Sequence, residues 1–249
     1  MGRQYIDAMP APALATSRWP SLCEVCRQWG AGALCASCVA RFAAPAPRCG
    51  RCGLTLGVPA PACGACLREP PPFEHTVCAV DYAFPWDRLV REFKFQGRPE
   101  LAGVLAGRLL AAVQTAVQNT ALPLPQWVLP VPLGPQRLAQ RGYNQAWELA
   151  RRLAAALHLQ AQSAWLLRPL DGAHQAELGR ADRQRNLRNA FMLEPRRRPA
   201  LEGCRVALVD DVMTTGATAS EAANALLRGG AAAVDLWVLA RTPDPSATG

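Results

Sequence analysis

The 249-residue sequence predicts an α/β protein with a parallel sheet, preceded by a small cysteine-rich module. Two observations support this prediction. Short apolar runs rich in β-branched residues alternate with longer segments of helical periodicity, without an internal repeat, which is typical of a parallel sheet. Eight of the ten cysteines are concentrated before residue 67. With half of its residues hydrophobic, the chain is long enough to bury one sizeable core plus an appendage.

The cysteine-rich module contains four C-x-x-C pairs. Two intervening residues let both thiolates of a pair reach one tetrahedral ion, and a second pair completes a site, so the spacing predicts two structural zinc ions. The pairs allow three groupings, of which we favour consecutive pairs because short loops close at lower entropic cost. The alternative is a disulfide framework, which is disfavoured in a cytosolic chain of this size. The predicted ligands are Cys23, Cys26, Cys35, Cys38, Cys49, Cys52, Cys63 and Cys66.

Composition divides the chain into segments. We expect a flexible amino terminus at 1–21 and the double zinc ribbon at 22–68. A proline-stiffened linker at 69–75 precedes the α/β domain at 76–242, and a flexible tail follows at 243–249. No apolar run approaches the ~20 residues of a membrane span, and the first twenty residues lack a signal-peptide pattern. We therefore predict a cytoplasmic protein without membrane insertion.

Periodicity predicts the elements of the α/β domain in order. A strand is predicted at 77–84, a long helix at 100–118, and a segment entering the sheet at 126–132. Between the first strand and the long helix, apolar residues recur at helical spacing: Trp86, Leu89, Val90 and Phe93. A further amphipathic helix is predicted at 144–159, and the candidates for its buried side are Trp147, Leu149, Leu153 and Leu157.

The stretch RVALVDDVMTTGATAS, which begins at residue 205, places two aspartates after an apolar run. The run Val206–Val209 suits a buried strand of a parallel sheet. Asp210 and Asp211 follow at its carboxyl end, where open α/β sheets bind ligands. Carboxylates accept hydrogen bonds from paired hydroxyls such as the 2′ and 3′ hydroxyls of a ribose. We therefore predict that the two aspartates bind a sugar.

The residues after the aspartates predict a phosphate site. Thr218 and Glu221 form a T-x-x-E capping box, so the preceding loop lies against a helix amino terminus, where unpaired N–H groups favour an anion. The alternative is an acidic turn and a capped helix without a ligand, which the cost of burying like charges disfavours. The predicted ribose and phosphate residues are Asp210, Asp211, Met213, Thr214, Thr215, Gly216, Ala217 and Thr218.

Residues 206–218, VALVDDVMTTGAT, resemble the phosphoribosyl-pyrophosphate (PRPP) signature of type I phosphoribosyltransferases. The segments VPVPLGPQRLAQRGYNQA, QAELGRADRQRN and VDLWVLART, with the cysteine cluster, resemble the ComF/GntX family over nearly the whole chain. The resemblance implies a parallel sheet with helices on both faces, PRPP bound with Mg²⁺, and phosphoribosyl transfer to an unknown acceptor with release of pyrophosphate. It also implies a link to DNA uptake in natural transformation. The candidate catalytic residues are Asp210, Asp211 and Arg183.

The turn after the segment 126–132 offers backbone and charged donors for pyrophosphate. A solvated basic helix face is the alternative interpretation. The predicted pyrophosphate residues are Leu133, Gly134, Arg137, Arg141 and Asn144.

Residues 171–188 are polar and long for a connection, so they form either a lid that excludes water or a disordered loop without a role. In the family that the chain resembles, this segment is the flexible loop over the site. The residues that match the family's motif there are Gln175, Leu178, Arg183 and Asn186.

Lys94 and Arg98 lie in a segment that precedes the core in the family. They could meet an acidic acceptor, but we favour a snorkelling lysine and an exposed arginine.

The formal charge of +8 suits anionic partners. The leading hypothesis is a PRPP-binding phosphoribosyltransferase. The alternative is a non-catalytic PRPP-sensing or DNA-handling adaptor, whose zinc ribbons bind a protein of the DNA-uptake machinery or single-stranded DNA. Between Cys23 and Cys66 the aromatic residues are only Trp29 and Phe42, which is a poor stacking platform for single strands.

Overall fold

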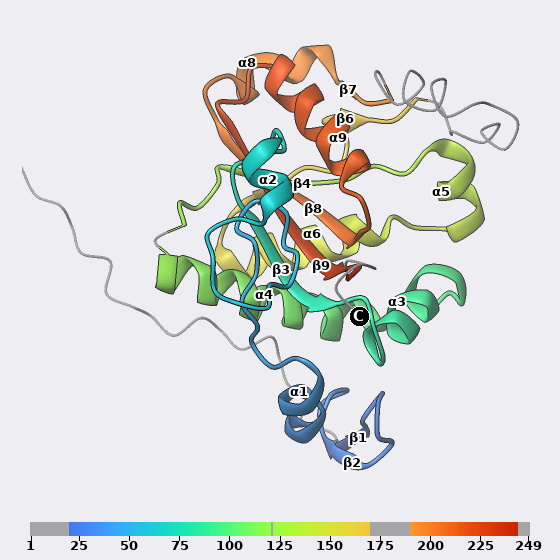
Figure 1. Ribbon diagram of the computed structural model, residues 1–249. Helices are drawn as coiled ribbons and strands as arrows, with labels where there is room; N and C mark the ends of the chain where they lie inside the picture. The colour runs from blue at the N-terminus through green and yellow to red at the C-terminus, as the bar shows by residue number, and fades with distance from the viewer. Residues whose placement is uncertain (1–19, 121, 170–189, 244–249) are drawn as a thin grey trace, which may run out of the picture.

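A computed structural model describes residues 20–120, 122–169 and 190–243. The α/β domain is built on a five-stranded parallel sheet of order β3-β9-β8-β4-β5 (Figure 1). Its strands are β3 (Thr76–Asp81), β4 (Trp127–Pro130), β5 (Gln160–Ala161), β8 (Arg205–Met213) and β9 (Ala233–Arg241). Because the strands are parallel, their carboxyl ends lie at one edge of the sheet, and Pro130 at the end of β4 pairs with Val209, next to the acid pair.

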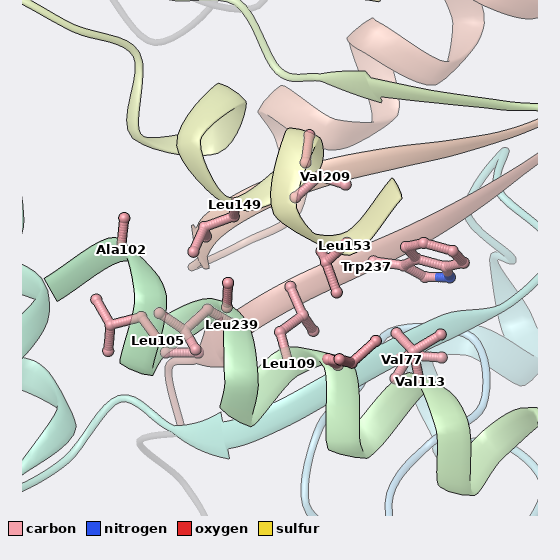
Figure 2. Close-up of a cluster of buried hydrophobic side chains, with 14 of the residues drawn as sticks. Val77, Ala102, Leu105, Leu109, Val113, Leu149, Leu153, Val209, Trp237 and Leu239 are labelled. Atoms are coloured by element: carbon pink, nitrogen blue, oxygen red, sulfur yellow. The ribbon is translucent and has the colours of Figure 1, made fainter. Parts of the chain in front are cut away.

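Three helices build the core on one side of the sheet. They are α3 (Trp86–Phe95), α4 (Leu101–Thr120) and α6 (Gln145–Leu157). Leucines of α4 and α6 pack around Trp237 of β9, which is 1% exposed (Figure 2). The four apolar residues predicted to recur on α3 are all buried, as are Leu149 and Leu153 of α6, whereas Trp147 and Leu157 are only partly buried.

The opposite face of the sheet is covered by α9 (Ala217–Arg228) and, beside it, the hairpin of β6 (Leu166–Leu167) and β7 (Met192–Leu193). The 3₁₀ turn η1 (Pro195–Arg197) and the short helix α8 (Arg198–Leu201) lead from the hairpin into β8. The buried side of α9 is lined by alanines, and small side chains let a helix lie close to a sheet. The prediction of helices on both faces is therefore confirmed.

The cysteine-rich module contains little regular structure. Strands β1 (Pro20–Leu22) and β2 (Trp29–Ala31) pair antiparallel, followed by the short helices α1 (Ala36–Phe42) and α2 (Gly64–Arg68). Strand β1 begins at Pro20, inside the stretch that we expected to be irregular. The rest of that stretch, residues 1–19, and most of the expected tail, residues 244–249, lie outside the described residues.

Helix α4 is a long apolar helix, although no uninterrupted apolar run in the sequence approaches the length of a membrane span. It is long and apolar enough to cross a membrane by length and composition, with a mean hydropathy of 1.3. Seven of its residues, from Leu101 to Val113, are buried in the core of the domain. In this structure α4 therefore serves as a core helix.

Candidate functional site

The two aspartates of β8 lie at the carboxyl edge of the sheet, inside the strand and not after it. Successive side chains of a strand point to opposite faces, so Asp211 shares the face of Val209 and Asp210 shares the face of Leu208. A carboxylate oxygen of Asp210 accepts from the backbone N–H of Asp211 at 2.8 Å. Burial, reinforced by the charge of Asp211, raises the pKa of Asp210 to about 8.

Lys94, the only lysine of the chain, reaches the acid pair from helix α3. Its Nζ atom lies 2.8 Å from an Oδ1 of Asp211, and the two side chains are 17% and 9% exposed. The interpretation of Lys94 as a snorkelling residue is therefore wrong. The sequence signal that could have pointed to it is its uniqueness among so many arginines.

A cavity of about 520 Å³ adjoins Lys94 and is strongly cationic. Helix α5 (Pro135–Arg141) provides Arg137, Gln140 and Arg141, and the end of α3 provides Lys94 and Phe95. The guanidinium of Arg141 lies over the Phe95 ring, 4.8 Å from its centroid, and also donates to Gln145 at 3.1 Å. Among the residues that the structure describes, three basic side chains and no acidic one line this cavity, which suits a multiply charged anion.

The phosphate loop, which we define as Thr214–Gly216, joins β8 to α9. Gly216 has φ +84°, and a Cβ there would lie 2.7 Å from the Cε of Met213, so only glycine suits this position. The predicted capping box is wrong, because Gly216 is the N-cap of α9 and no side chain caps the helix. The N–H of Ala217 donates to the hydroxyl of Thr215 at 3.4 Å, and the N–H groups of Thr218 and Ala219 are the donors that the helix start offers to an anion.

The other residues that we predicted to bind pyrophosphate or to form a lid differ in where they lie in the structure. Asn144 is the N-cap of α6, accepting from the N–H groups of Ala146 and Trp147, and its amide donates to the carbonyl of Val131 at 3.1 Å. These bonds account for Asn144 without a ligand. Gly134 is the buried N-cap of α5, just before the arginines. The proposed lid residues Gln175, Leu178, Arg183 and Asn186 lie outside the described residues.

The eight paired cysteines form two clusters of four, and in each the ligand atoms lie within 4.8 Å of one another. The first cluster contains Cys23, Cys26, Cys35 and Cys38, and the second cluster contains Cys49, Cys52, Cys63 and Cys66. The prediction that consecutive pairs share a site is confirmed. Four sulfur donors at this spacing could hold a zinc ion in each cluster.

The backbone around each cluster favours thiolates. In the first cluster the N–H of Cys35 donates to the sulfur of Cys23 at 3.5 Å, and in the second the N–H of Cys63 donates to that of Cys49 at 3.2 Å. Burial acts to raise the pKa of Cys23, but backbone N–H groups, first that of Cys26 and then that of Cys35, outweigh it and lower the pKa to about 6. Burial and the neighbouring thiols raise the pKa of Cys38 in the first cluster and of Cys66 in the second, so a bound cation is needed for all four sulfurs of a cluster to be thiolates together.

The sequence is similar to that of named proteins over most of its length. It is 41% identical over 229 residues to DNA utilization protein YhgH of Salmonella typhi, covering 90% of this chain and 98% of that protein. It is 36% identical over 175 residues to Competence protein F of Haemophilus influenzae, covering 70% and 76%. Glutamine PRPP amidotransferase from B. subtilis is a similar solved structure, with a TM-score of 0.40 and 20% identity over 60% of this chain and 30% of that one.

No family model matches the chain. The relatives nevertheless settle its membership, because the alignment with the Salmonella protein leaves almost none of that protein uncovered. The chain belongs with DNA utilization protein YhgH and Competence protein F to the ComF/GntX family.

Proposed function

We propose that the chain binds PRPP at the carboxyl edge of its sheet. The observation that carries the proposal is the position of Lys94, which pairs with Asp211 and also lines the cationic cavity. A ligand held by the acid pair and the cavity together must offer hydroxyl groups on one side and several negative charges on the other. PRPP has this combination, because its ribose hydroxyls lie next to its pyrophosphate.

The phosphate loop would hold the 5′-phosphate. The side chains of Thr214 and Thr215 are exposed, and the hydroxyl of Thr215 accepts from the N–H of Ala217 at 3.4 Å, beside the N–H groups of Thr218 and Ala219 that would face the phosphate. Met213 is 4% exposed and packs inward, so it would contribute only its backbone. Of the residues predicted to bind the phosphate, the loop would therefore offer backbone N–H groups and two hydroxyl side chains, as expected for an anion site built on main-chain donors.

The pyrophosphate would occupy the cavity of Lys94, Arg137 and Arg141. Mg²⁺ would be held mainly by the pyrophosphate and ribose oxygens, and it would neutralise charge that builds up on the leaving group. Asp211 would accept from a ribose hydroxyl once Lys94 turns toward the incoming charge. Asp210, with its raised pKa, could bind the sugar as a neutral acid or as a carboxylate.

We also propose that this binding serves DNA use or DNA uptake, because the relatives are named for DNA utilization and competence. Phosphoribosyl would pass to an acceptor with release of pyrophosphate. A protein that senses PRPP without transfer would use the same binding residues. Pyrophosphate release over a panel of amines, bases and single-stranded DNA separates the two, since only transfer releases it.

Calorimetric titration tests the binding site. We expect the parent to bind PRPP with Mg²⁺, and Lys94→Met to weaken PRPP by about 10- to 100-fold, which corresponds to ~1.5–3 kcal/mol for a charged hydrogen bond. The same variant should bind inorganic phosphate normally. Gly216→Val should weaken PRPP, ribose-5-phosphate and phosphate together. The proposal fails if a folded Lys94→Met protein binds PRPP like the parent, or if the parent does not bind it.

A further inference from the structure

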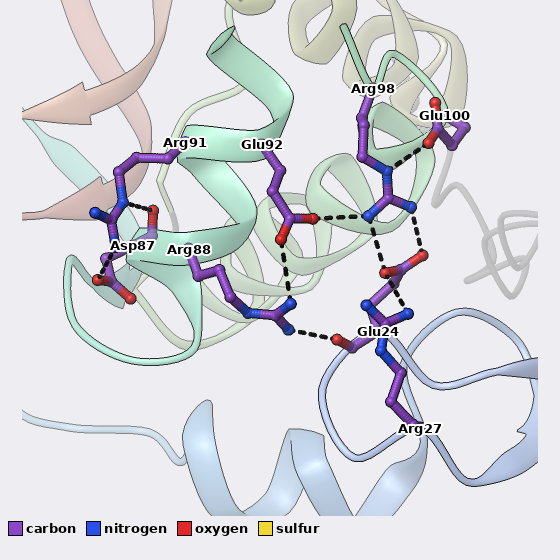
Figure 3. Close-up of polar contacts among 8 residues, drawn as sticks. All are labelled: Glu24, Arg27, Asp87, Arg88, Arg91, Glu92, Arg98 and Glu100. Carbon is purple, nitrogen blue, oxygen red and sulfur yellow. Dashed lines mark hydrogen bonds and ion pairs between the residues drawn. The ribbon is translucent and has the colours of Figure 1, made fainter. Parts of the chain in front are cut away.

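The first cysteine cluster is attached to helix α3 through Arg98 (Figure 3). Glu24 lies between two ligands of that cluster, and its carboxylate receives two hydrogen bonds from Arg98, at 2.8 and 3.2 Å. The guanidinium of Arg98 also binds Glu92 of α3 at 2.7 Å. Arg88 of α3 donates to the backbone carbonyl of Glu24 at 2.5 Å. Arg98 is therefore not the exposed arginine that we expected, but the centre of an ion network between module and domain.

The same helix carries the lysine of the ligand site. Glu92 and Lys94 are two residues apart on α3, and Lys94 pairs with Asp211 at 2.8 Å. Helix α3 is thus fixed at one point to the loop that holds the first cluster and at another to the acid pair. Displacement of that loop would remove the polar contacts that, together with the buried apolar face of the helix, hold α3 in place.

The second cluster is attached to the phosphate loop through Arg241, the last residue of β9. The Nε of Arg241 donates to the backbone carbonyl of Cys52 at 3.1 Å. Its NH1 group donates to the carbonyl of Met213 at 3.3 Å and to that of Thr214. One side chain thus connects a ligand of the second cluster to the turn that would hold the 5′-phosphate.

We propose that metal binding at the two cysteine clusters and ligand binding at the sheet edge are thermodynamically coupled, with Arg98 and Arg241 as positioning residues. This inference rests on the proposed PRPP site. A metal ion fixes the backbone of each cluster, and each arginine carries that order to one half of the site: Arg98 to Lys94, and Arg241 to the phosphate loop. Coupling is reciprocal, so a ligand that fixes Lys94 and the loop must also raise the affinity of the clusters for metal.

The test measures the equilibrium distribution of zinc between the zinc-loaded full chain and a coloured chelator, with and without PRPP and Mg²⁺. In the parent we expect saturating PRPP to lower the apparent dissociation constant for zinc by about 5-fold or more, the low end of typical coupling. Arg98→Ala should lose the protection of one zinc ion while the other stays protected. Arg241→Lys, which cannot reach all three carbonyls, should lose the protection of the other ion.

Arg91→Ala is the matched control, because Arg91 pairs with Asp87 on the same helix and is 60% exposed (Figure 3). It should keep the parent's protection. All proteins are measured in the same buffer at the same PRPP concentration, so zinc bound by PRPP itself affects every variant equally.

Circular dichroism identifies a variant that fails to fold. If Arg241→Lys is that variant, the result for Arg98→Ala alone decides whether the coupling exists, because the side chain of Arg98 lies between the cysteine-rich module and the α/β domain. Calorimetry of the parent separates the two proposals. Absence of PRPP binding overturns the proposed function and the coupling with it. Binding of PRPP with equal zinc affinity in its presence and absence overturns the coupling alone, and so does a loss of protection in Arg91→Ala equal to that in Arg98→Ala.

Discussion

The two cysteine clusters share one ligand spacing but are attached to the α/β domain in different ways. The first cluster is held mainly at helix α3, by the ion network of Arg98 and by the indole N–H of Trp86, which donates to the carbonyl of Phe42 at 2.6 Å. The second cluster is held by the sheet itself, where the N–H of Thr76 donates to Gly50 at 2.8 Å and its hydroxyl to Arg51 at 2.7 Å. The spacing of cysteines builds a metal cluster, whereas residues outside the spacing decide what the cluster supports.

The largest expected effect comes from removing one ligand of each cluster. Cys49→Ser should lower the free energy of unfolding of the whole chain by about 3–5 kcal/mol, because loss of a structural metal site attached to β3 exposes the edge of the sheet. Cys23→Ser should unfold only the first cluster and leave the α/β domain folded. Thermal denaturation followed by circular dichroism, with zinc content, measures both. Equal losses of stability in Cys49→Ser and Cys23→Ser would contradict the proposed difference between the attachments of the two clusters.

A glycine in each cluster offers a matched pair. Gly53 has φ +70°, and a Cβ there would lie 3.0 Å from side-chain atoms of Cys78 and Thr76 on β3, while Gly32 has φ +85° with nothing within 4 Å. Alanine at either position costs ~1–2 kcal/mol of backbone strain. Gly53→Ala should cost ~1–3 kcal/mol more, from overpacking against the sheet. Chemical denaturation measures the free energy of unfolding of both variants. Equal losses would mean that the second cluster does not pack tightly against β3.

The buried carboxylate of Asp210, beside the residue that pairs with Lys94, should make the stability of the chain depend on pH. The pKa of Asp210 is raised from an ordinary 3.8 to about 8, so the folded state binds its proton more tightly than the unfolded state. Stability contributed by this group therefore falls as pH rises from about 4 to about 8. Asp210→Asn should raise the free energy of unfolding by ~1–3 kcal/mol at pH 8, and the gain should vanish near pH 4.

Asp211→Asn provides the comparison, because it leaves the buried carboxylate of Asp210 in place and removes the partner of Lys94, so its gain at pH 8 should be smaller. Urea denaturation at both pH values measures the two variants. A pH-independent gain in Asp210→Asn would show that burial of its charge is not the cause.

The smallest expected effect is that of the ion network. The side chains of Arg98 and Glu24 are 27% and 13% exposed, so their coupling should be ~0.5–1 kcal/mol. A double-mutant cycle with Arg98→Ala and Glu24→Gln measures it. At 1 M NaCl, where the Debye length is ~3 Å, the coupling should fall by about half. A coupling of zero at low salt would leave the first cluster attached by apolar packing alone.

Local patterns predicted much of the site. Helix α3 was predicted from four apolar residues because 3.6-residue periodicity reports directly on a buried face. The cysteine grouping followed from loop closure, which depends only on distance along the chain. The capping box failed because Gly216, with its left-handed backbone, ends the loop two residues earlier than the side chains of Thr218 and Glu221 suggest.

The sequence by itself determined which residues are able to bind metal, which run forms the acidic strand and where glycine must stand. It could not determine that Lys94 meets Asp211, or that Arg98 and Arg241 connect the clusters to the site. Arg98 and Glu24 are 74 residues apart in the sequence, and Arg241 and Cys52 are 189 residues apart. A long basic side chain has the same local sequence pattern on a surface as in an ion pair. Only the tertiary structure decides which acid or carbonyl such a side chain reaches, because the choice depends on how helix α3 and strand β9 pack on the sheet.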